Sequence, residues 1–383
     1  MTNIESSPAH GWRDRADGHR IERVDTFVLN VPLRREIADA LYVRTHWRIP
    51  VVEIRTSDGL VGTGYSGVWE GHDLIVDAIN RYLGPMLVGA DGSFIGEIWN
   101  EMYWSPLHWV GRAGVTHMSL GMVDMALWDL ASRRAELPLW KMLGGTSGDL
   151  ETYNTDGGWL NFTMEELVDD TLDMVERGWR SVKMKIGGAD PRVDVERVAY
   201  LRSKLPGDVQ IMVDVNQRWD LFTARRYAGA LGDLDVAWLE EPLHPDDVVG
   251  HAALARVSAV PIALGENVYS AEAFANFLQA DAVDIVQVDV TRVAGITEWL
   301  RVAHAAISRS RQVIPHAGDM MQVHQHLASA VRHASPMIEF LPWGLEVFAE
   351  PIKLSGSRIQ LPLTPGASSA ISSEARRRFD ASR

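Results

Sequence analysis

A strand–helix unit of nearly constant length repeats through the second half of the chain. From about residue 149, amphipathic segments alternate with short apolar ones, which read SVKMKIG, QIMVDVNQ, AWLEEP, PIALGEN, DIVQVDV, QVIPHAG and MIEFLP. The most polar inward candidates in these segments recur at nearly even intervals, at positions 185, 214, 240, 266, 289, 316 and 339. Equal units of this kind give parallel strands that can close into a barrel. An open doubly wound sheet is the alternative, but it would need a glycine fingerprint that the sequence lacks.

The first part of the chain has a different pattern. Residues 21–148 begin with two strand-like stretches, RIERVDTFVLNVPL and PVVEIRTSDGLVGTGYS, and the Ser-Asp-Gly turn in the second predicts a hairpin. Helical spacing of apolar residues follows, which predicts an α+β module ahead of the barrel. We expect residues 1–20 to form a flexible tail and residues 149–345 to form the barrel.

Composition excludes several classes of function. The 383 residues contain no cysteine, which rules out disulfides, thiolate catalysis and Cys-ligated zinc. The net charge of −14 argues against a nucleic-acid-binding protein and favours a small-molecule partner. The chain shows neither a signal-peptide core nor a stretch long enough for a bilayer, so we expect a cytoplasmic protein with no membrane partner.

Three carboxylates occupy successive strand ends. Asp214, Glu240 and Glu266 are equally spaced in the sequence, so equivalent positions around a barrel bring them together. Three adjacent anions repel one another unless a cation compensates them. Oxygen ligands without Cys or His favour a hard divalent ion, Mg²⁺ first and Mn²⁺ next. The alternative is that salt bridges to Lys183 and Lys185 compensate these carboxylates.

Basic and acidic groups flank this set. Lys183 and Lys185 alternate on one strand, so both ammonium groups project from the same face. A neighbouring ammonium and a divalent metal would lower the pKa of Lys185, which would then serve as a general base, while Lys183 would hold a substrate carboxylate. Asp289 beside His316 would orient the imidazole and stabilise its protonated form.

These residues, taken in order, resemble the enolase superfamily and, within it, the mandelate racemase subgroup. The matching motifs are KMKIG, MVDVNQRWD, WLEEP, LGEN, VDVTRVAGITEW, IPHAG and MIEFLP, together with VDMALWDLASRRAELPLWKMLGG before the barrel. The resemblance implies an α/β fold, a modified TIM barrel of the (β/α)7β type with an N-terminal α+β capping domain at residues 21–148. It also implies that residues 346–383 return to the cap.

The chemistry that the resemblance implies is removal of the proton next to a substrate carboxylate, giving an enediolate stabilised by Mg²⁺. Asp214, Glu240 and Glu266 would then be the metal ligands. Lys183 would be an electrophilic stabiliser, and Glu339 would be protonated and donate a hydrogen bond to the carboxylate. The acid/base groups on opposite faces of the substrate would be Lys185 and the pair formed by Asp289 and His316.

The reaction itself stays open between several outcomes. We favour dehydration of an acid sugar, an aldonate or aldarate, to a 2-keto-3-deoxy acid. A racemase or epimerase of a 2-hydroxy acid or amino-acid derivative is the second hypothesis, and a non-catalytic barrel that binds metal and ligand is the third. We also expect a homo-oligomer.

Substrate selectivity in the family lies in cap loops, and here the lid-like segment LRREIADALYVRTHWR is polar and partly cationic. A second loop, GYSGVWEGH, offers Tyr65, Trp69 and Glu70. The predicted substrate-binding residues are Arg44, His46, Trp47, Thr155, Asp156 and Asn216.

Overall fold

Parallel strands form a barrel in the computed structural model, which describes residues 19–146, 148–317 and 320–381. Within these residues, eight barrel strands run in chain order: β4 (Leu150–Asn154), β5 (Ser181–Lys185), β6 (Gln210–Asp214), β7 (Val236–Glu240), β8 (Ile262–Leu264), β9 (Ile285–Val286), β10 (Gln312–Val313) and β11 (Met337–Phe340). Neighbours pair in parallel from β4 to β10, and β11 returns to pair with β4. This arrangement confirms the predicted parallel barrel and excludes the open sheet.

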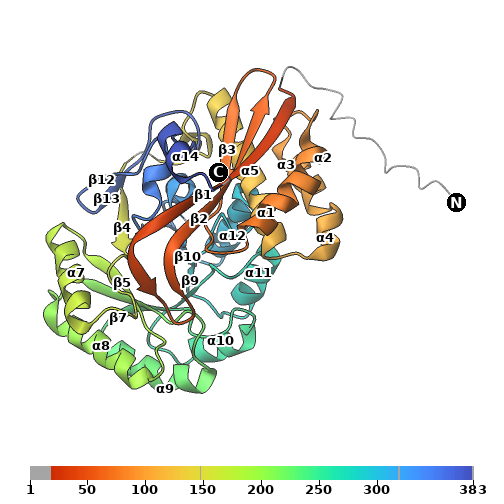
Figure 1. Ribbon diagram of the computed structural model, residues 1–383. Helices are drawn as coiled ribbons and strands as arrows, with labels where there is room; N and C mark the ends of the chain where they lie inside the picture. The colour runs from red at the N-terminus through yellow and green to blue at the C-terminus, as the bar shows by residue number, and fades with distance from the viewer. Residues whose placement is uncertain (1–18, 147, 318–319, 382–383) are drawn as a thin grey trace.

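Helices connect the strands and cover the outside of the barrel (Figure 1). They are α7 (Met164–Glu176), α8 (Pro191–Lys204), α9 (Leu221–Asp233), α10 (Val248–Ala255), α11 (Ala271–Gln279), α12 (Ile296–Ser308) and α13 (Gln322–Ala330). Side-chain caps begin several of them; in α7, Thr163 and Glu166 form a reciprocal capping box. With one helix between each pair of consecutive strands, the described barrel has the (β/α)7β order.

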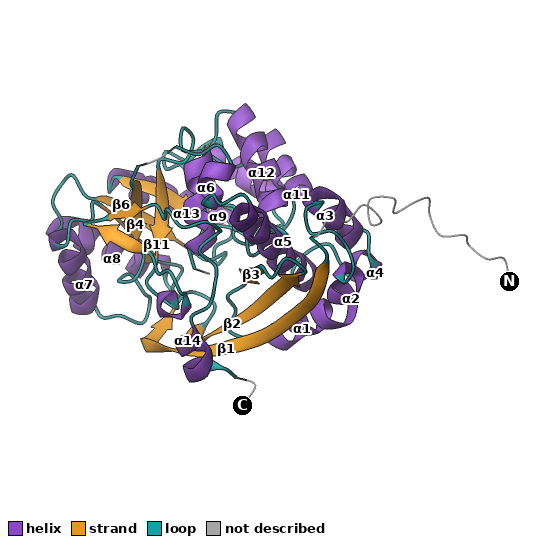
Figure 2. Cartoon of the chain, turned by 90° about the horizontal axis from the view of Figure 1, so that it is seen from above, coloured by secondary structure: helices purple, strands orange, loops and turns teal. Residues whose placement is uncertain are grey.

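The N-terminal module is an antiparallel sheet with helices against it. Strands β1 (Ile21–Ala38), β2 (Val43–Thr56) and β3 (Val61–Tyr65) pair in chain order, and the tight turn between β2 and β3 confirms the predicted hairpin. The helical segments are α1 (His72–Ala78), the π-helix η2 (Ile79–Leu83), α2 (Gly84–Leu87), α3 (Ile95–Tyr103), α4 (Pro106–Val110), α5 (Val115–Arg134) and α6 (Leu139–Met142). Figure 2 shows β1 and β2 as long curved strands beside the barrel.

Close contact between the sheet and α5 depends on two glycines of β3. A Cβ on Gly64 would lie 1.8 Å from the carbonyl oxygen of Met122, and one on Gly62 would lie 2.1 Å from that of Ala126. No side chain fits at those separations, so glycine is what lets β3 lie directly on the α5 backbone. Helix α5 is buried along most of its length between the sheet and the barrel.

The C-terminal segment contacts the N-terminal module. It contains η3 (Leu345–Val347), β12 (Lys353–Ser355), β13 (Arg358–Gln360) and α14 (Ser373–Phe379). The hydroxyl of Ser369 donates to the carbonyl of Thr63 at 2.7 Å, and the N–H of Ala381 donates to the carbonyl of Val28 at 2.9 Å. These bonds join the C-terminal segment to the N-terminal sheet. The strand and helix order confirms the modified TIM barrel with an N-terminal capping domain.

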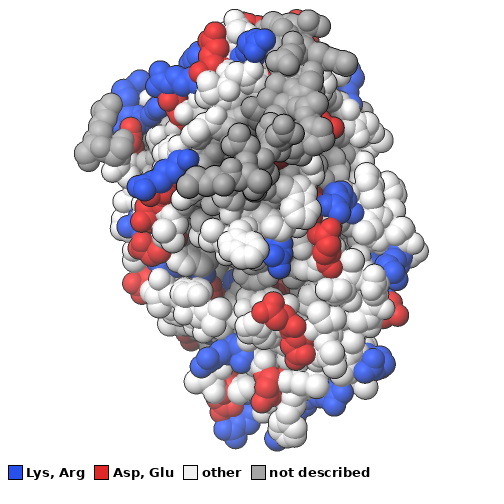
Figure 3. Space-filling view, turned by 90° about the vertical axis from the view of Figure 1, so that its right-hand side faces the viewer, with Lys and Arg blue, Asp and Glu red and all other residues white. Residues whose placement is uncertain are grey.

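Charged side chains are interspersed on the surface. On the face shown in Figure 3, lysines and arginines lie next to aspartates and glutamates and form no large basic area. Among the described helices, none has both the length and the apolar character needed to cross a membrane. The tail predicted for residues 1–20 falls largely on residues 1–18, outside the described residues.

Candidate active site

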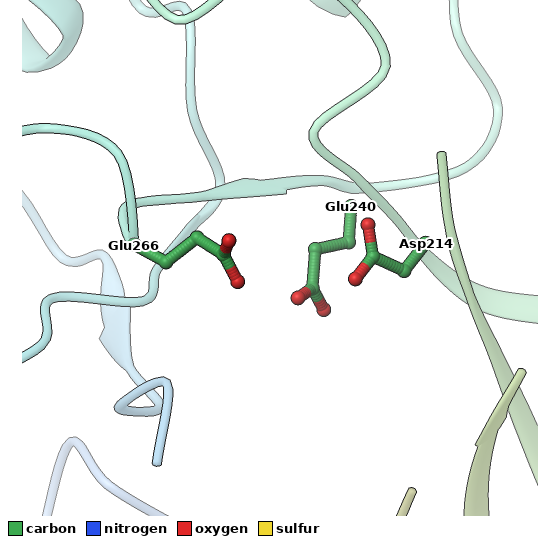
Figure 4. Close-up of side chains that lie close together, drawn as sticks. All are labelled: Asp214, Glu240 and Glu266. Carbon is green, nitrogen blue, oxygen red and sulfur yellow. The ribbon is translucent and has the colours of Figure 1, made fainter. Parts of the chain in front are cut away.

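Three carboxylates meet at the C-terminal end of the barrel strands. Asp214 ends β6, Glu240 ends β7, and Glu266 lies just beyond the end of β8. One oxygen from each lies within 4.8 Å of the others, and the three side chains converge in Figure 4. Asp214 and Glu240 are fully buried, which excludes the solvent that normally screens such repulsion. The equal spacing of the three residues in the sequence correctly predicted this convergence.

The two lysines of β5 lie against these carboxylates. The Nζ atom of Lys183 is 2.6 Å from Oε1 of Glu240 and 3.0 Å from Oε1 of Glu339. The Nζ atom of Lys185 is 2.5 Å from Oδ2 of Asp214. Both the predicted carboxylate cluster and the alternative of lysine salt bridges are therefore present in one site.

The protein's own charges shift the pKa values of two predicted site residues. Burial by itself lowers the pKa of Lys185, but the Asp214 carboxylate outweighs it and raises the pKa above its usual value. Burial also favours the neutral form of Glu339, yet the Lys183 ammonium, 3.0 Å away, lowers the pKa of this carboxyl to about 2. A lowered pKa for Lys185 and a protonated Glu339 were predicted for a site that holds metal and substrate, and both stay predictions.

A histidine bridges two acids on the other side of the carboxylate set. His316 follows β10, and its Nδ1 atom lies 2.7 Å from Oδ2 of Asp289 while its Nε2 atom lies 2.9 Å from Oε2 of Glu266. Burial disfavours the imidazolium, but Glu266 and Asp289 together raise the pKa of His316 well above its usual value. Asp289 is itself held by the backbone N–H and hydroxyl of Thr291, both at 2.8 Å.

Hydrogen bonds from uncharged side chains hold the carboxylates in place. Gln287 and Trp238 donate to Oε2 of Glu240 at 2.7 and 3.1 Å. Asn267 donates to Glu266 at 3.0 Å and to the neighbouring buried Glu241 at 2.9 Å. Side chains locked by such contacts keep the geometry of a metal or catalytic site.

A cavity opens between this cluster and the cap. The cavity is lined by Asp39, Arg44, Trp47, Trp69, Thr155, Trp159, Lys185, Asn216, Glu266, Arg292, His316, Glu339, Leu341 and Trp343. Four of the six predicted substrate-binding residues, Arg44, Trp47, Thr155 and Asn216, are in this lining.

The structure places the other two outside this lining. His46 is exposed and bonds to Thr45 at 2.9 Å, because strand alternation turns it away from the face that carries Trp47. The Oδ1 atom of Asp156 accepts a hydrogen bond from Nε1 of Trp343 at 2.9 Å.

Several cavity residues were not singled out from the sequence. Asp39 has no motif around it, and its place depends on the turn between β1 and β2. Arg292 lies shortly after Asp289 in the motif VDVTRVAGITEW, so the sequence could have predicted that it lies near the site. Trp159 and Trp343 come from loops after β4 and β11, and their rings stack at 4.8 Å. Nothing local in the sequence indicates that pairing.

The donor set fits a hard divalent cation. Asp214, Glu240 and Glu266 supply oxygen atoms only, Asp214 and Glu240 are buried, and the three carboxylates carry more negative charge than Lys183 and Lys185 neutralise. Lys185 and His316 lie on either side of this set as groups able to carry protons. The arrangement can bind a carboxylate substrate and exchange protons at the carbon next to it.

Comparison with known proteins gives matches over nearly the whole chain. Residues 23–144 match the mandelate racemase/muconate lactonizing enzyme N-terminal domain, and residues 166–375 match the enolase C-terminal domain-like family. An L-talarate/galactarate dehydratase of Salmonella typhimurium is 32% identical over 366 residues, or 94% of this chain and 91% of the relative. A 3,6-anhydro-alpha-L-galactonate cycloisomerase of Streptomyces coelicolor is 34% identical over 90% of this chain and 95% of the relative.

Solved structures give the same result. L-talarate dehydratase from Polaromonas sp. JS666, crystallised with Mg and L-glucarate, superposes with a TM-score of 0.87 and is 33% identical over 94% of this chain and 97% of that one. The relatives act on acid sugars, and this structural neighbour holds magnesium, the cofactor that the sequence predicted. The chain is an enzyme that belongs to the mandelate racemase/muconate lactonizing enzyme family of the enolase superfamily.

Proposed function

We propose that this enzyme dehydrates an acid sugar, an aldonate or aldarate, to a 2-keto-3-deoxy acid with Mg²⁺ as cofactor. One observation carries the proposal: Lys185 and His316 line the same cavity beside the three converging carboxylates. The names of the relatives support an acid-sugar substrate.

Asp214, Glu240 and Glu266 would hold Mg²⁺, which when bound supplies positive charge to stabilise the second negative charge that develops on the substrate carboxylate. Lys183, between Glu240 and Glu339, adds a fixed ammonium to the same end of the site. Fixed charges of this kind need no rearrangement when the charge develops, so they lower the barrier to removing a weakly acidic proton.

The chain supplies both proton transfers. One of the pair Lys185 and His316 takes the proton from the carbon next to the carboxylate, and the C–H electron pair moves into the carboxylate to give the enediolate. The other delivers a proton to the hydroxyl on the next carbon, which leaves as water as its C–O bond breaks. The resulting enol becomes the 2-keto acid. Asp289 orients His316 for this transfer through the 2.7 Å hydrogen bond at Nδ1.

The racemase alternative uses the same groups but returns a proton to the carbon that lost it. The two reactions are separated by incubating the Mg²⁺-loaded enzyme in D₂O with aldonic, aldaric and simple 2-hydroxy acids. Formation of a 2-keto acid from an acid sugar supports the dehydratase. Deuterium uptake with inversion and no keto acid would replace it with the racemase or epimerase. Binding of acids without exchange or turnover would favour a non-catalytic barrel.

We also propose the domain boundaries and the setting. The cap would comprise residues 21–148, the barrel residues 149–345, and the returning segment residues 346–383. A small-molecule carboxylate would be the substrate of a cytoplasmic homo-oligomer that binds neither nucleic acid nor membranes. Light scattering at several protein concentrations tests the oligomer, and a strictly monomeric mass would refute it.

A further inference from the structure

An internal ion pair closes the cap side of the cavity. The Oδ2 atom of Asp39 lies 2.5 Å from Nη2 of Arg44, and both side chains are buried. The other oxygen of Asp39 accepts hydrogen bonds from the N–H groups of Leu41 and Tyr42 at 2.7 and 2.8 Å. Asp39 is therefore fixed in the turn that joins β1 to β2, with its carboxylate at the cavity wall.

Arg44 is held equally firmly. Its guanidinium carbon lies 3.6 Å from the ring centroid of Trp69, which is a stacked cation–π contact. With Asp39 in contact at one edge and Trp69 on one face, the pair is electrically neutral as a unit. A second carboxylate placed here would find no uncompensated cation and would face the charge of Asp39.

The cations on the barrel side of the cavity are paired with carboxylates of the barrel. Lys185 contacts Asp214, and His316 contacts Glu266 and Asp289. The positive charge of Arg292 lowers the pKa of Glu266, so Arg292 also belongs to the barrel side of the cavity. The cap side and the barrel side thus differ: the barrel end would attract a carboxylate when Asp214, Glu240 and Glu266 hold Mg²⁺, whereas the Asp39–Arg44 end is neutral.

Buried polar atoms without a partner mark the lining as a binding site. Among the described residues, Nε of Arg44, Nε1 of Trp47, Oγ1 of Thr155 and Oδ1 of Asn216 are buried and make no hydrogen bond. All four residues line the cavity, and each is less than one-tenth exposed. Buried polar groups are normally satisfied, so the residues lining this cavity have unused hydrogen-bonding capacity. They include both donors and acceptors, which is what a hydroxyl group requires.

We propose that the Asp39–Arg44 pair binds the hydroxyl end of the substrate and selects an acid sugar with one carboxylate, an aldonate, over one with two, an aldarate. This inference rests on the proposed dehydratase function and narrows its substrate class. Trp47, Trp159 and Trp343 form the adjoining wall, with ring centroids of Trp47 and Trp343 5.8 Å apart. The indole N–H groups of Trp159 and Trp343 both donate to Asp156, so that wall is largely ring surface and suits the C–H surface of a sugar chain.

The test compares acids that differ only at the far end: gluconate with glucarate, and galactonate with galactarate. Calorimetry on the Mg²⁺-loaded enzyme gives Kd for each acid, and keto-acid formation gives kcat/KM. We expect at least one monoacid to exceed its diacid by about tenfold or more, the effect of setting two like charges together. Asp39→Asn keeps an oxygen for the turn and removes the charge, so it should shift the ratio towards the diacid by about tenfold.

Asp170→Asn is the matched control, because Asp170 also pairs with a cap arginine, Arg35, but outside this cavity. Its monoacid-to-diacid ratio should equal that of the wild type. A wild-type preference for diacids, or an Asp39→Asn ratio that stays unchanged in the folded variant, would overturn the inference while leaving the dehydratase intact. Monoacid binding without keto acid would instead refute the proposed function and retain the selectivity. No binding of any of the four acids would overturn both.

Discussion

The Nδ1 atom of His316 lies 2.7 Å from Oδ2 of Asp289, with both side chains buried at the end of neighbouring barrel strands. The carboxylate fixes which nitrogen of the imidazole faces the cavity and stabilises the protonated ring. In the absence of such a partner, an imidazole at this depth would lose protons readily and rotate. The pair therefore sets the competence of His316 as a proton carrier.

Asp289→Asn should lower kcat for the proposed dehydration by about 10³-fold, because an amide neither stabilises the imidazolium nor enforces the same tautomer. The far-ultraviolet spectrum and melting temperature check that the variant is folded. Asp281→Asn, which changes an exposed aspartate near β9, should keep wild-type kcat. A fully active, folded Asp289→Asn enzyme would show that His316 acts without this partner.

Metal binding should depend on each of the three converging carboxylates. We expect Glu266→Gln to weaken Mg²⁺ binding by more than about 100-fold, since replacing a ligand should exceed the effect of replacing a residue behind it. Titration calorimetry measures the affinity, and chelation of the wild type should abolish turnover until Mg²⁺ or Mn²⁺ is restored. Glu272→Gln, an exposed glutamate on α11, serves as the control and should bind Mg²⁺ normally. Unchanged binding by Glu266→Gln would remove this residue from the ligand set.

Replacing the two proton carriers one at a time should separate their roles. Lys185→Ala and His316→Asn should each reduce dehydration by about 10²-fold to 10⁴-fold. The variant that has lost only the general acid should still exchange the proton next to the substrate carboxylate with D₂O. The variant that has lost the general base should not. Lys141→Ala, at an exposed lysine in α6, is the control. Equal loss of exchange in both variants would contradict a division into one base and one acid.

A buried histidine of α13 should make stability depend on pH. Nδ1 of His326 accepts the backbone N–H of Trp140 at 3.1 Å, and burial lowers its pKa from 6.5 to about 3. The unfolded chain therefore binds a proton below pH 6.5 that the folded chain does not. The contribution to stability is full above pH 6.5 and falls as the pH drops towards 3.

The matched variant is His326→Asn, which offers an acceptor to Trp140 and does not titrate. Between pH 7 and pH 5 the free energy of unfolding of the wild type should fall by about 2 kcal/mol more than that of the variant. Urea unfolding at a series of pH values measures the difference. Parallel pH profiles would mean that His326 is protonated in the folded enzyme.

Gly64→Ala should destabilise the contact between the cap sheet and α5. The added Cβ would meet the carbonyl oxygen of Met122 at 1.8 Å, so backbone must move, at a cost of about 3 kcal/mol. Gly96→Ala is the control: it lies inside helix α3 with nothing within 4 Å of its Cβ position. That substitution should stabilise the protein by about 0.5 to 1 kcal/mol. Equal stabilities in chemical unfolding would refute the packing argument.

The sequence by itself determined the barrel and its polar strand ends. A strand–helix repeat of nearly constant length fixes the order of parallel strands, and the fold then places Asp214, Glu240, Glu266, Asp289 and His316 at one rim. These inferences succeed because strand alternation and repeat length are local properties of the chain.

The tertiary structure decided what local patterns do not carry. The face of β2 that meets the cavity includes Trp47 and excludes His46, and this depends on pairing with β1 and on its irregular register near Pro32. The lowered pKa of Glu339 depends on Lys183, which lies on a strand far away in sequence. Asp39 became important only through its contact with Arg44. Charge balance and cavity shape arise from residues brought together by packing, so the selectivity of the cap side could not be predicted from the sequence. The polar residues of the rim could be predicted, because each one follows a strand of the repeat.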